Sequence, residues 1–96
     1  MTMKTVTFNG AECSLEFLQY TNGNPALQLW HEGMPYAMAT VNDPDVELEP
    51  TQVLIKDYSE NSGMVDALVA AGIVTRTEEY ALMGPYGAKA WVCNLN

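Results

Sequence analysis

The chain has 96 residues, a length that fits a single domain over residues 1–96. Apolar residues make up 48% of it, which is enough for one hydrophobic core and excludes an intrinsically disordered chain. Twelve acidic residues against four basic ones give a formal net charge of −8, which repels phosphate groups. We therefore expect neither nucleic acid nor a membrane as a direct partner, and favour a basic protein surface.

The first twenty residues predict a β-hairpin. Asn9-Gly10 is a favoured pair for a tight type I′ turn, because both turn positions need a positive φ. A two-residue loop pairs Val6 with Cys13, and the apolar residues then alternate with polar ones on both strands. We expect one face of this hairpin to point into the core: Val6, Phe8, Cys13, Leu15 and Phe17.

The remaining chain alternates short strand patterns with turns and one helix. Strands are expected at about residues 26–32, 36–41, 52–58, 73–83 and 88–95. A helix is expected from about Asn61 to Ala71, where apolar residues recur on one side and Gly72 fits a left-handed stop. The sequence thus predicts the α+β class: an antiparallel β-sheet of about six or seven strands with one α-helix packed on it.

Residues 42–50, NDPDVELEP, carry an acid at every second position. An extended backbone would align these carboxylates as a ladder on one edge: Asp43, Asp45, Glu47 and Glu49. Pro44 and Pro50 bracket the segment and exclude it from the middle of a sheet. The spacing lacks the glycine and the terminal acid of a calcium loop, so we predict no metal site. Contact with a basic protein, mimicry of a nucleic-acid backbone and a merely solvated loop stay open.

Trp30 is a second candidate for protein binding. Strand alternation places it opposite Leu29 and His31, among polar neighbours, where an exposed tryptophan commonly anchors an interface. The alternative is that the helix covers this face and buries Trp30. His31, the single histidine, is expected to be packed and hydrogen-bonded.

Residues 56–61, KDYSEN, form the other dense polar cluster. An enzyme could use Lys56, Asp57 and Tyr58 as acid–base groups. The competing interpretation is that Asp57 and Ser59 bind the free amides at the start of the helix. We favour the second interpretation, and predict no catalytic residues.

Two cysteines, Cys13 and Cys93, and one histidine are too few for a four-ligand zinc site, and we expect no cofactor. The start of the chain lacks the apolar core of a signal peptide. We therefore expect a cytosolic protein with two reduced, mostly buried thiols.

Residues 39–74 resemble a family of small uncharacterised proteins of bacterial phages, plasmids and integrated elements. The resemblance lies in the segments ATVN and KDYSENxGM, although Ser62 stands where the family pattern has an acid. It implies an accessory protein of a mobile element, a class that includes inhibitors of host defence.

Charge and resemblance together predict a non-enzymatic, protein-binding accessory factor. Its expected partner is a basic surface of a host nucleic-acid-handling defence complex, of the restriction or CRISPR kind. Two alternatives stay open: a small enzyme with its site at Lys56–Asn61, and a structural component of a homo-oligomer.

Overall fold

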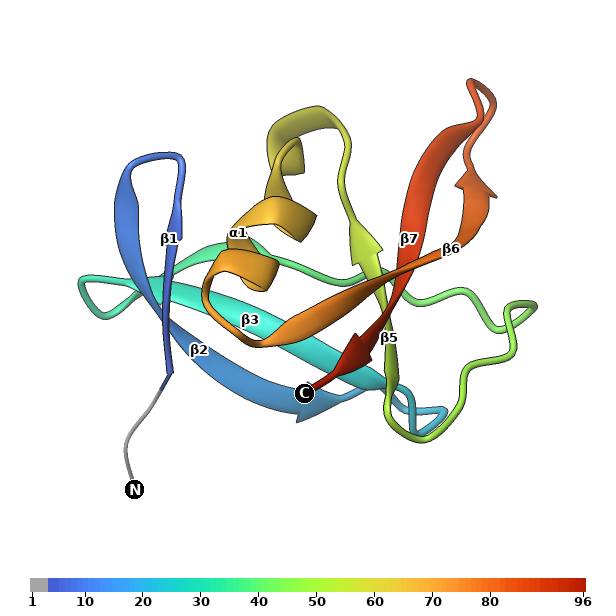
Figure 1. Ribbon diagram of the computed structural model, residues 1–96, viewed down its shortest axis with the longest axis horizontal. Coiled ribbons are helices and arrows are strands. Elements are labelled where there is room, and N and C mark those ends of the chain that lie inside the picture. The colour runs from blue at the N-terminus through green and yellow to red at the C-terminus, as the bar shows by residue number, and fades with distance from the viewer. Residues whose placement is uncertain (1–3) are drawn as a thin grey trace.

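The structure, a computed structural model, describes residues 4–96 and contains seven β-strands and one α-helix (Figure 1). The predicted α+β class is confirmed. The elements in chain order are β1 (Thr5–Phe8), β2 (Ala11–Gln19), β3 (Pro25–His31), β4 (Met34–Met38), β5 (Gln52–Lys56), the 3-10 turn η1 (Ser59–Asn61), α1 (Met64–Ala70), β6 (Val74–Met83) and β7 (Ala88–Leu95).

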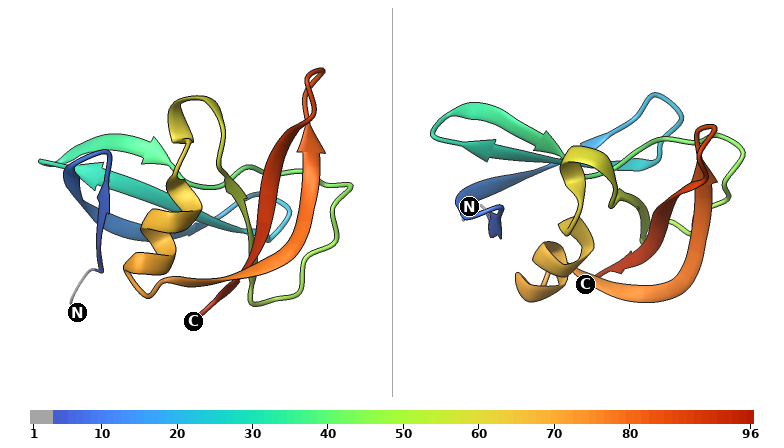
Figure 2. Two further views of the ribbon diagram at one scale, coloured as in Figure 1. Left: turned by 45° about the horizontal axis from the view of Figure 1, so that its top comes forward. Right: turned by 90° about the horizontal axis from the view of Figure 1, so that it is seen from above.

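The strands form two antiparallel sheets, with the orders β1-β2-β3-β4 and β5-β7-β6. The segment after β4 connects them, because the Val41 amide donates to the Leu54 carbonyl (3.0 Å) and the Lys56 amide donates to the Ala39 carbonyl (2.9 Å). Figure 2 shows the two sheets diverging from this connection. The sequence pattern predicts one sheet. Two sheets form instead, because residues 39–41 pair with β5 only briefly before the chain turns away into the following loop.

The predicted hairpin is confirmed, including its register. Val6 lies opposite Cys13, and the turn residues Asn9 and Gly10 have φ angles of 51° and 78°, as a type I′ turn requires. Val6, Cys13 and the other expected core residues of the hairpin are buried, with one exception. Phe17 is 55% exposed, so its predicted core position is wrong. β1 pairs only as far as Ser14, and Phe17 lies on the part of β2 that extends beyond it.

The helix begins at Met64, later than the sequence suggested. Gly63 has a φ of 93° and interrupts the helical path, so residues 59–61 form a separate 3-10 turn. Gly72 has a φ of 75° and ends the helix as expected.

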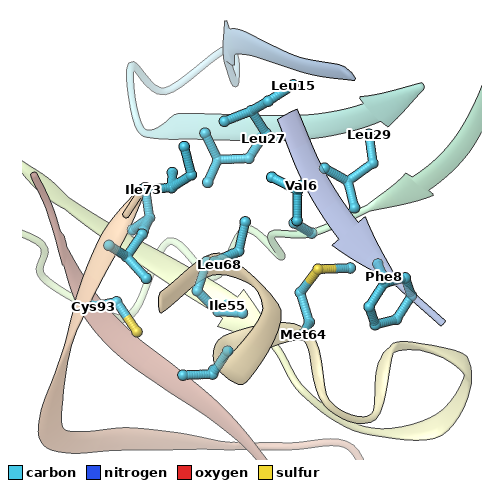
Figure 3. Packing of buried hydrophobic residues seen from close by; sticks show 14 of the residues in the cluster. Val6, Phe8, Leu15, Leu27, Leu29, Ile55, Met64, Leu68, Ile73 and Cys93 are labelled. Atoms are coloured by element: carbon cyan, nitrogen blue, oxygen red, sulfur yellow. The ribbon is translucent and has the colours of Figure 1, made fainter. Parts of the chain in front are cut away.

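The main core fills the space between the two sheets and α1. The helix contributes Met64, Val65 and Leu68, all fully buried, and packs against β1, β5 and β6. Figure 3 shows Leu68 and Met64 pointing toward side chains of both sheets. Since β1 and β6 are the outer strands of their sheets, the helix spans the opening between them (Figure 1).

A second, smaller apolar cluster lies on the other face of the three-stranded sheet. Leu54, Ala90 and Val92 are buried there, and Val46 and Leu48 from the loop before β5 pack against them. No helix in the described part of the chain is long and apolar enough to cross a membrane.

Replacing Leu68 by Ala is expected to destabilise the protein by about 2–5 kcal/mol, because a fully buried leucine leaves a cavity between the two sheets. Chemical denaturation of the purified protein measures this change. Val69, on the same helix and 42% exposed, provides the matched control, and its replacement by Ala is expected to change stability by about 0.5 kcal/mol or less. Similar losses for both variants would contradict the position of α1.

Candidate functional site

The acidic loop, residues 42–51, begins with a proline turn. The Asp43 carbonyl accepts a hydrogen bond from the Val46 amide (3.1 Å), with Pro44 at the second turn position. The Asp43 carboxylate also accepts one from the Asp45 amide (3.0 Å). Asp43 therefore belongs to a turn, and the predicted ladder of four carboxylates is not an extended one along its whole length.

The second half of the loop keeps the predicted alternation. Val46 and Leu48 pack on the small cluster of the three-stranded sheet, so Asp45, Glu47 and Glu49 point to solvent between them. A second turn closes the loop, in which the Gln52 amide donates to the Glu49 carbonyl (2.9 Å). Two apolar anchors thus hold three exposed carboxylates on the surface.

The loop forms one wall of an open groove of about 480 Å³. The β2–β3 turn forms another wall, where Asn22 and Asn24 both donate side-chain hydrogen bonds to the Asn42 side-chain oxygen (3.3 and 3.1 Å). The groove is lined by Asn22, Asn24, Pro44, Val46, Glu47, Leu48, Glu49, Gln52 and Glu79.

Glu79 brings a third carboxylate into the groove from β6. The pairing of β6 with β7 is irregular between Arg76 and Tyr80, and the Thr77 hydroxyl donates to the Val92 carbonyl at this point (2.5 Å). Such a bulge redirects the side chains that follow it. Glu79 is not predictable from the sequence, because a strand pattern containing Glu78-Glu79 does not indicate where the regular pairing of the strand breaks.

The carboxylates of the acidic loop and Glu79 form no ion pair with a basic side chain of the described residues. Among residues 4–96, none of these five lies within 4.0 Å of a lysine, arginine or histidine side-chain nitrogen. The ion pairs of the described chain lie elsewhere and join His31 to Glu32, Lys56 to Glu60 and Arg76 to Asp66. The groove therefore carries a negative charge that nearby side chains leave uncompensated, and it attracts cationic groups.

The carboxylates of the groove are spread out rather than converging. Within residues 4–96, no group of three or more His, Cys, Asp or Glu side chains is arranged to hold a metal ion. The groove thus suits several separate cationic groups, such as the lysine and arginine side chains of a protein, and the amide oxygens of its Asn and Gln side chains can accept further hydrogen bonds.

Trp30 lies apart from the groove, on the face of the four-stranded sheet that does not contact the main core. Its indole N–H donates to the Glu16 carboxylate (3.0 Å), and the side chain is half-buried beside Ser14 and Gly33. The helix packs on the opposite face, with Leu29, so it does not cover Trp30. The two parts of the predicted binding set are therefore not brought together.

His31 occupies the position expected from its pattern. Its Nδ1 is 2.9 Å from the Glu12 carbonyl, and its ring lies 5.5 Å from that of Tyr36. Tyr36 in turn contacts Phe8 edge-on, at 6.5 Å between ring centres. His31 and Tyr36 thus extend the core outward from Phe8, and these contacts give His31 a structural role.

The KDYSEN cluster holds the start of the helix. The Asp57 carboxylate accepts hydrogen bonds from the Gly63 amide (2.7 Å) and the Val65 amide (3.0 Å), which confirms its predicted role. The same prediction for Ser59 is wrong, since no side chain of η1 caps the helix. Asn61 is buried and donates instead to the Met38 carbonyl (2.7 Å).

The ATVN segment connects the sheets. Ala39 is fully buried, and the Thr40 hydroxyl accepts a hydrogen bond from the Leu27 amide (3.2 Å) and bonds to the Tyr20 hydroxyl (2.9 Å). The residues that carry the family resemblance thus have roles in folding. Comparisons of the chain with protein-family models, curated proteins and solved structures found no match. The resemblance stays a prediction.

Cys13 and Cys93 are free, buried thiols of the main core. Burial raises the pKa of the Cys93 thiol to about 11 and also raises that of Cys13. Both thiols therefore stay protonated near neutral pH and are poor nucleophiles in the folded protein.

Replacing Asp57 by Ala is expected to cost about 0.5–2 kcal/mol of stability, because two helix amides lose their acceptor. Thermal and chemical unfolding measure the change. Replacing Ser59 by Ala removes no cap and serves as the control, with an expected change below about 0.5 kcal/mol. An unchanged stability of the Asp57 variant would show that the cap is unimportant.

Glu60 is expected to titrate far below its ordinary pKa of 4.5. The hydrogen bond from the Lys56 ammonium, with smaller contributions from its own backbone and Ser59, lowers the pKa to about 2. Since the folded-state pKa is the lower one, the contribution to stability is present above about pH 4.5 and is lost as the pH falls toward 2. Carboxyl NMR titration of Glu60 measures this pKa.

In the same titration, replacing Lys56 by Gln is expected to return the Glu60 pKa toward 4.5. Replacing Lys89 by Gln removes an equal charge elsewhere and is expected to leave the titration unchanged. A low pKa in the Lys56 variant would exclude the ion pair as its cause.

Proposed function

We propose that this chain is a non-enzymatic accessory protein that binds a basic surface of a partner protein through its acidic groove. The observation that carries the proposal is the uncompensated charge of that groove, which Glu47, Glu49 and Glu79 line from two elements without a basic neighbour among residues 4–96. Exposed charges of one sign raise the rate of encounter with a surface of the opposite sign.

The construction of the acidic loop supports a role in recognition. Its apolar anchors Val46 and Leu48 fix the backbone, so the exposed carboxylates need little further ordering when a partner binds. Preorganisation of this kind reduces the entropic cost of association.

The partner class follows from charge and from the family resemblance. Proteins that handle nucleic acids expose basic surfaces for the phosphate backbone, and an acidic protein can occupy such a surface in place of the nucleic acid. The resemblance of residues 39–74 to proteins of mobile elements then favours a host defence complex as the target. The proposed activity is inhibition by occupying its basic surface.

The contacts at the KDYSEN cluster favour this proposal over an enzyme at the same residues. Asp57 binds two backbone amides, and Lys56 binds Glu60. Tyr58 packs against the small apolar cluster. Each group proposed for acid–base chemistry is thus engaged in a structural contact.

The test compares the wild type with a variant in which Asp43 and Asp45 become Asn, and Glu47 and Glu49 become Gln. Pull-down from a bacterial lysate identifies a partner, and affinity for the purified partner is then measured at low and high salt. Each exposed ion pair contributes about 0.2–1 kcal/mol, so the variant is expected to lose roughly 1–4 kcal/mol of binding free energy. Its binding should also depend less on salt.

The matched control changes four exposed acids outside the groove to Gln: Glu12, Glu32, Glu60 and Glu78. It alters net charge equally, and we expect it to retain most of the affinity. Equal affinity and equal salt dependence for the wild type and the loop variant would overturn the proposal and leave the loop as a solvated surface.

A further inference from the structure

A second surface lies on the face of the three-stranded sheet opposite the acidic loop. Tyr80 on β6 lies directly opposite Trp91 on β7, and Leu82 lies opposite Lys89, so these side chains share one face. The alternate residues Ala90 and Val92 point to the small cluster beneath the loop. We call this surface the aromatic ledge, defined by the residues Arg76, Tyr80, Leu82, Lys89 and Trp91.

The aromatic ledge lies next to the main core and extends from it to the protein surface. Trp91 is half-buried against the core cluster, and its ring lies 5.2 Å from that of Tyr80. Tyr80 and Leu82 are 47% and 65% exposed, respectively. Neighbouring exposed tyrosine, leucine and tryptophan side chains are typical of the centre of a protein interface.

The ledge also gathers two of the four basic residues of an acidic chain. The Lys89 ammonium lies 4.6 Å from the centre of the Tyr80 ring and 5.6 Å from that of Trp91. Arg76 lies over Trp91 and binds Asp66, whereas Lys89 has no carboxylate within 4.0 Å among residues 4–96. Lys89 can therefore form an ion pair with a carboxylate of another molecule.

The backbone beside the ledge is an open sheet edge. β6 is an outer strand, and within the described chain β7 is its one strand neighbour. The stretch Tyr80–Met83 contains neither a proline nor a charged residue, the two features that usually block edge-to-edge pairing. The outer strand β4, in contrast, carries Pro35, which cannot donate a backbone hydrogen bond.

We propose that the aromatic ledge binds an extended segment of a partner protein that presents both apolar and acidic side chains on one face, at every second position. The segment adds as a strand along Tyr80–Met83, and the side chains of that one face place a carboxylate beside Lys89 and apolar groups beside Tyr80 and Leu82. This site is independent of the proposed function, since it selects the opposite charge from the acidic loop. Single-stranded nucleic acid fits less well, because it has no peptide N–H and C=O groups that could pair with the outer strand β6.

Three probes test the site by NMR on the full chain: a capped ten-residue peptide in which every second residue is Thr and the residues between read Val-Glu-Val-Glu-Val, the same peptide with Lys for Glu, and a ten-nucleotide oligothymidine. The Glu peptide is expected to shift the amides of Tyr80–Met83, Lys89 and Trp91. Replacing Lys89 by Glu should lower the affinity for the Glu peptide about three- to tenfold, in line with the loss of one or two exposed charge interactions. The same replacement should raise the affinity for the Lys peptide.

Lys4 provides the matched control, because it is also exposed and its replacement by Glu changes net charge equally at the other sheet. Lys4→Glu is expected to bind the Glu peptide as the wild type does. The proposal is overturned if the Glu peptide shifts no ledge amide at millimolar concentration, or if the Lys peptide binds equally well. Tighter binding of oligothymidine would assign the ledge to nucleic acid, and shifts that follow protein concentration alone would assign it to a second copy of the chain.

Discussion

The burial of one short helix between two sheets is the interaction on which the rest of this structure depends. α1 has only seven residues, too few to be stable alone in water, so its helical form relies on the burial of Met64, Val65 and Leu68. The same burial holds the outer strands β1 and β6 at the distance the helix requires. Asp57 strengthens the arrangement, because its carboxylate ties the end of β5 to the first helical amides.

Because the covering elements are short, the three-stranded sheet is covered only in part on each face. On one face α1 packs near β5 and the start of β6, and leaves the far end of the β6–β7 hairpin to the aromatic ledge (Figure 2). On the other face a loop supplies only Val46 and Leu48 to the small cluster. The aromatic ledge thus lies where the sheet extends beyond the helix, and the acidic groove lies along the loop that covers the other face.

Local patterns in the sequence predicted the parts of the fold that depend on neighbours in the chain. Asn9-Gly10 determines both the turn and the register of the hairpin, and Gly72 ends the helix in the predicted way. The predicted core position of Phe17 is wrong because its exposure depends on where β1 ends. The alternation of residues along β2 does not indicate that end. The division into two sheets likewise depends on long-range pairing between residues 39–41 and β5.

The candidate site was predictable only where its charges are adjacent in sequence. The acids of residues 43–49 were evident, and so was their proline-bracketed, looped character. The groove itself was not evident, because it forms between that loop, the β2–β3 turn and a bulge in β6 that directs Glu79 toward the loop. Trp30 was assigned to the same binding set, yet a different sheet carries it.

The average charge of the chain conceals a separation between the two faces of one sheet. The acidic loop carries its carboxylates on one face without basic neighbours among residues 4–96, while Arg76 and Lys89 lie on the other face over Trp91. Apolar side chains rather than ion pairs anchor both surfaces: Val46 and Leu48 under the loop, and Trp91 against the core. The charges can therefore change without loss of the packing that positions them. A small protein built in this way can alter what each face binds while keeping the same core.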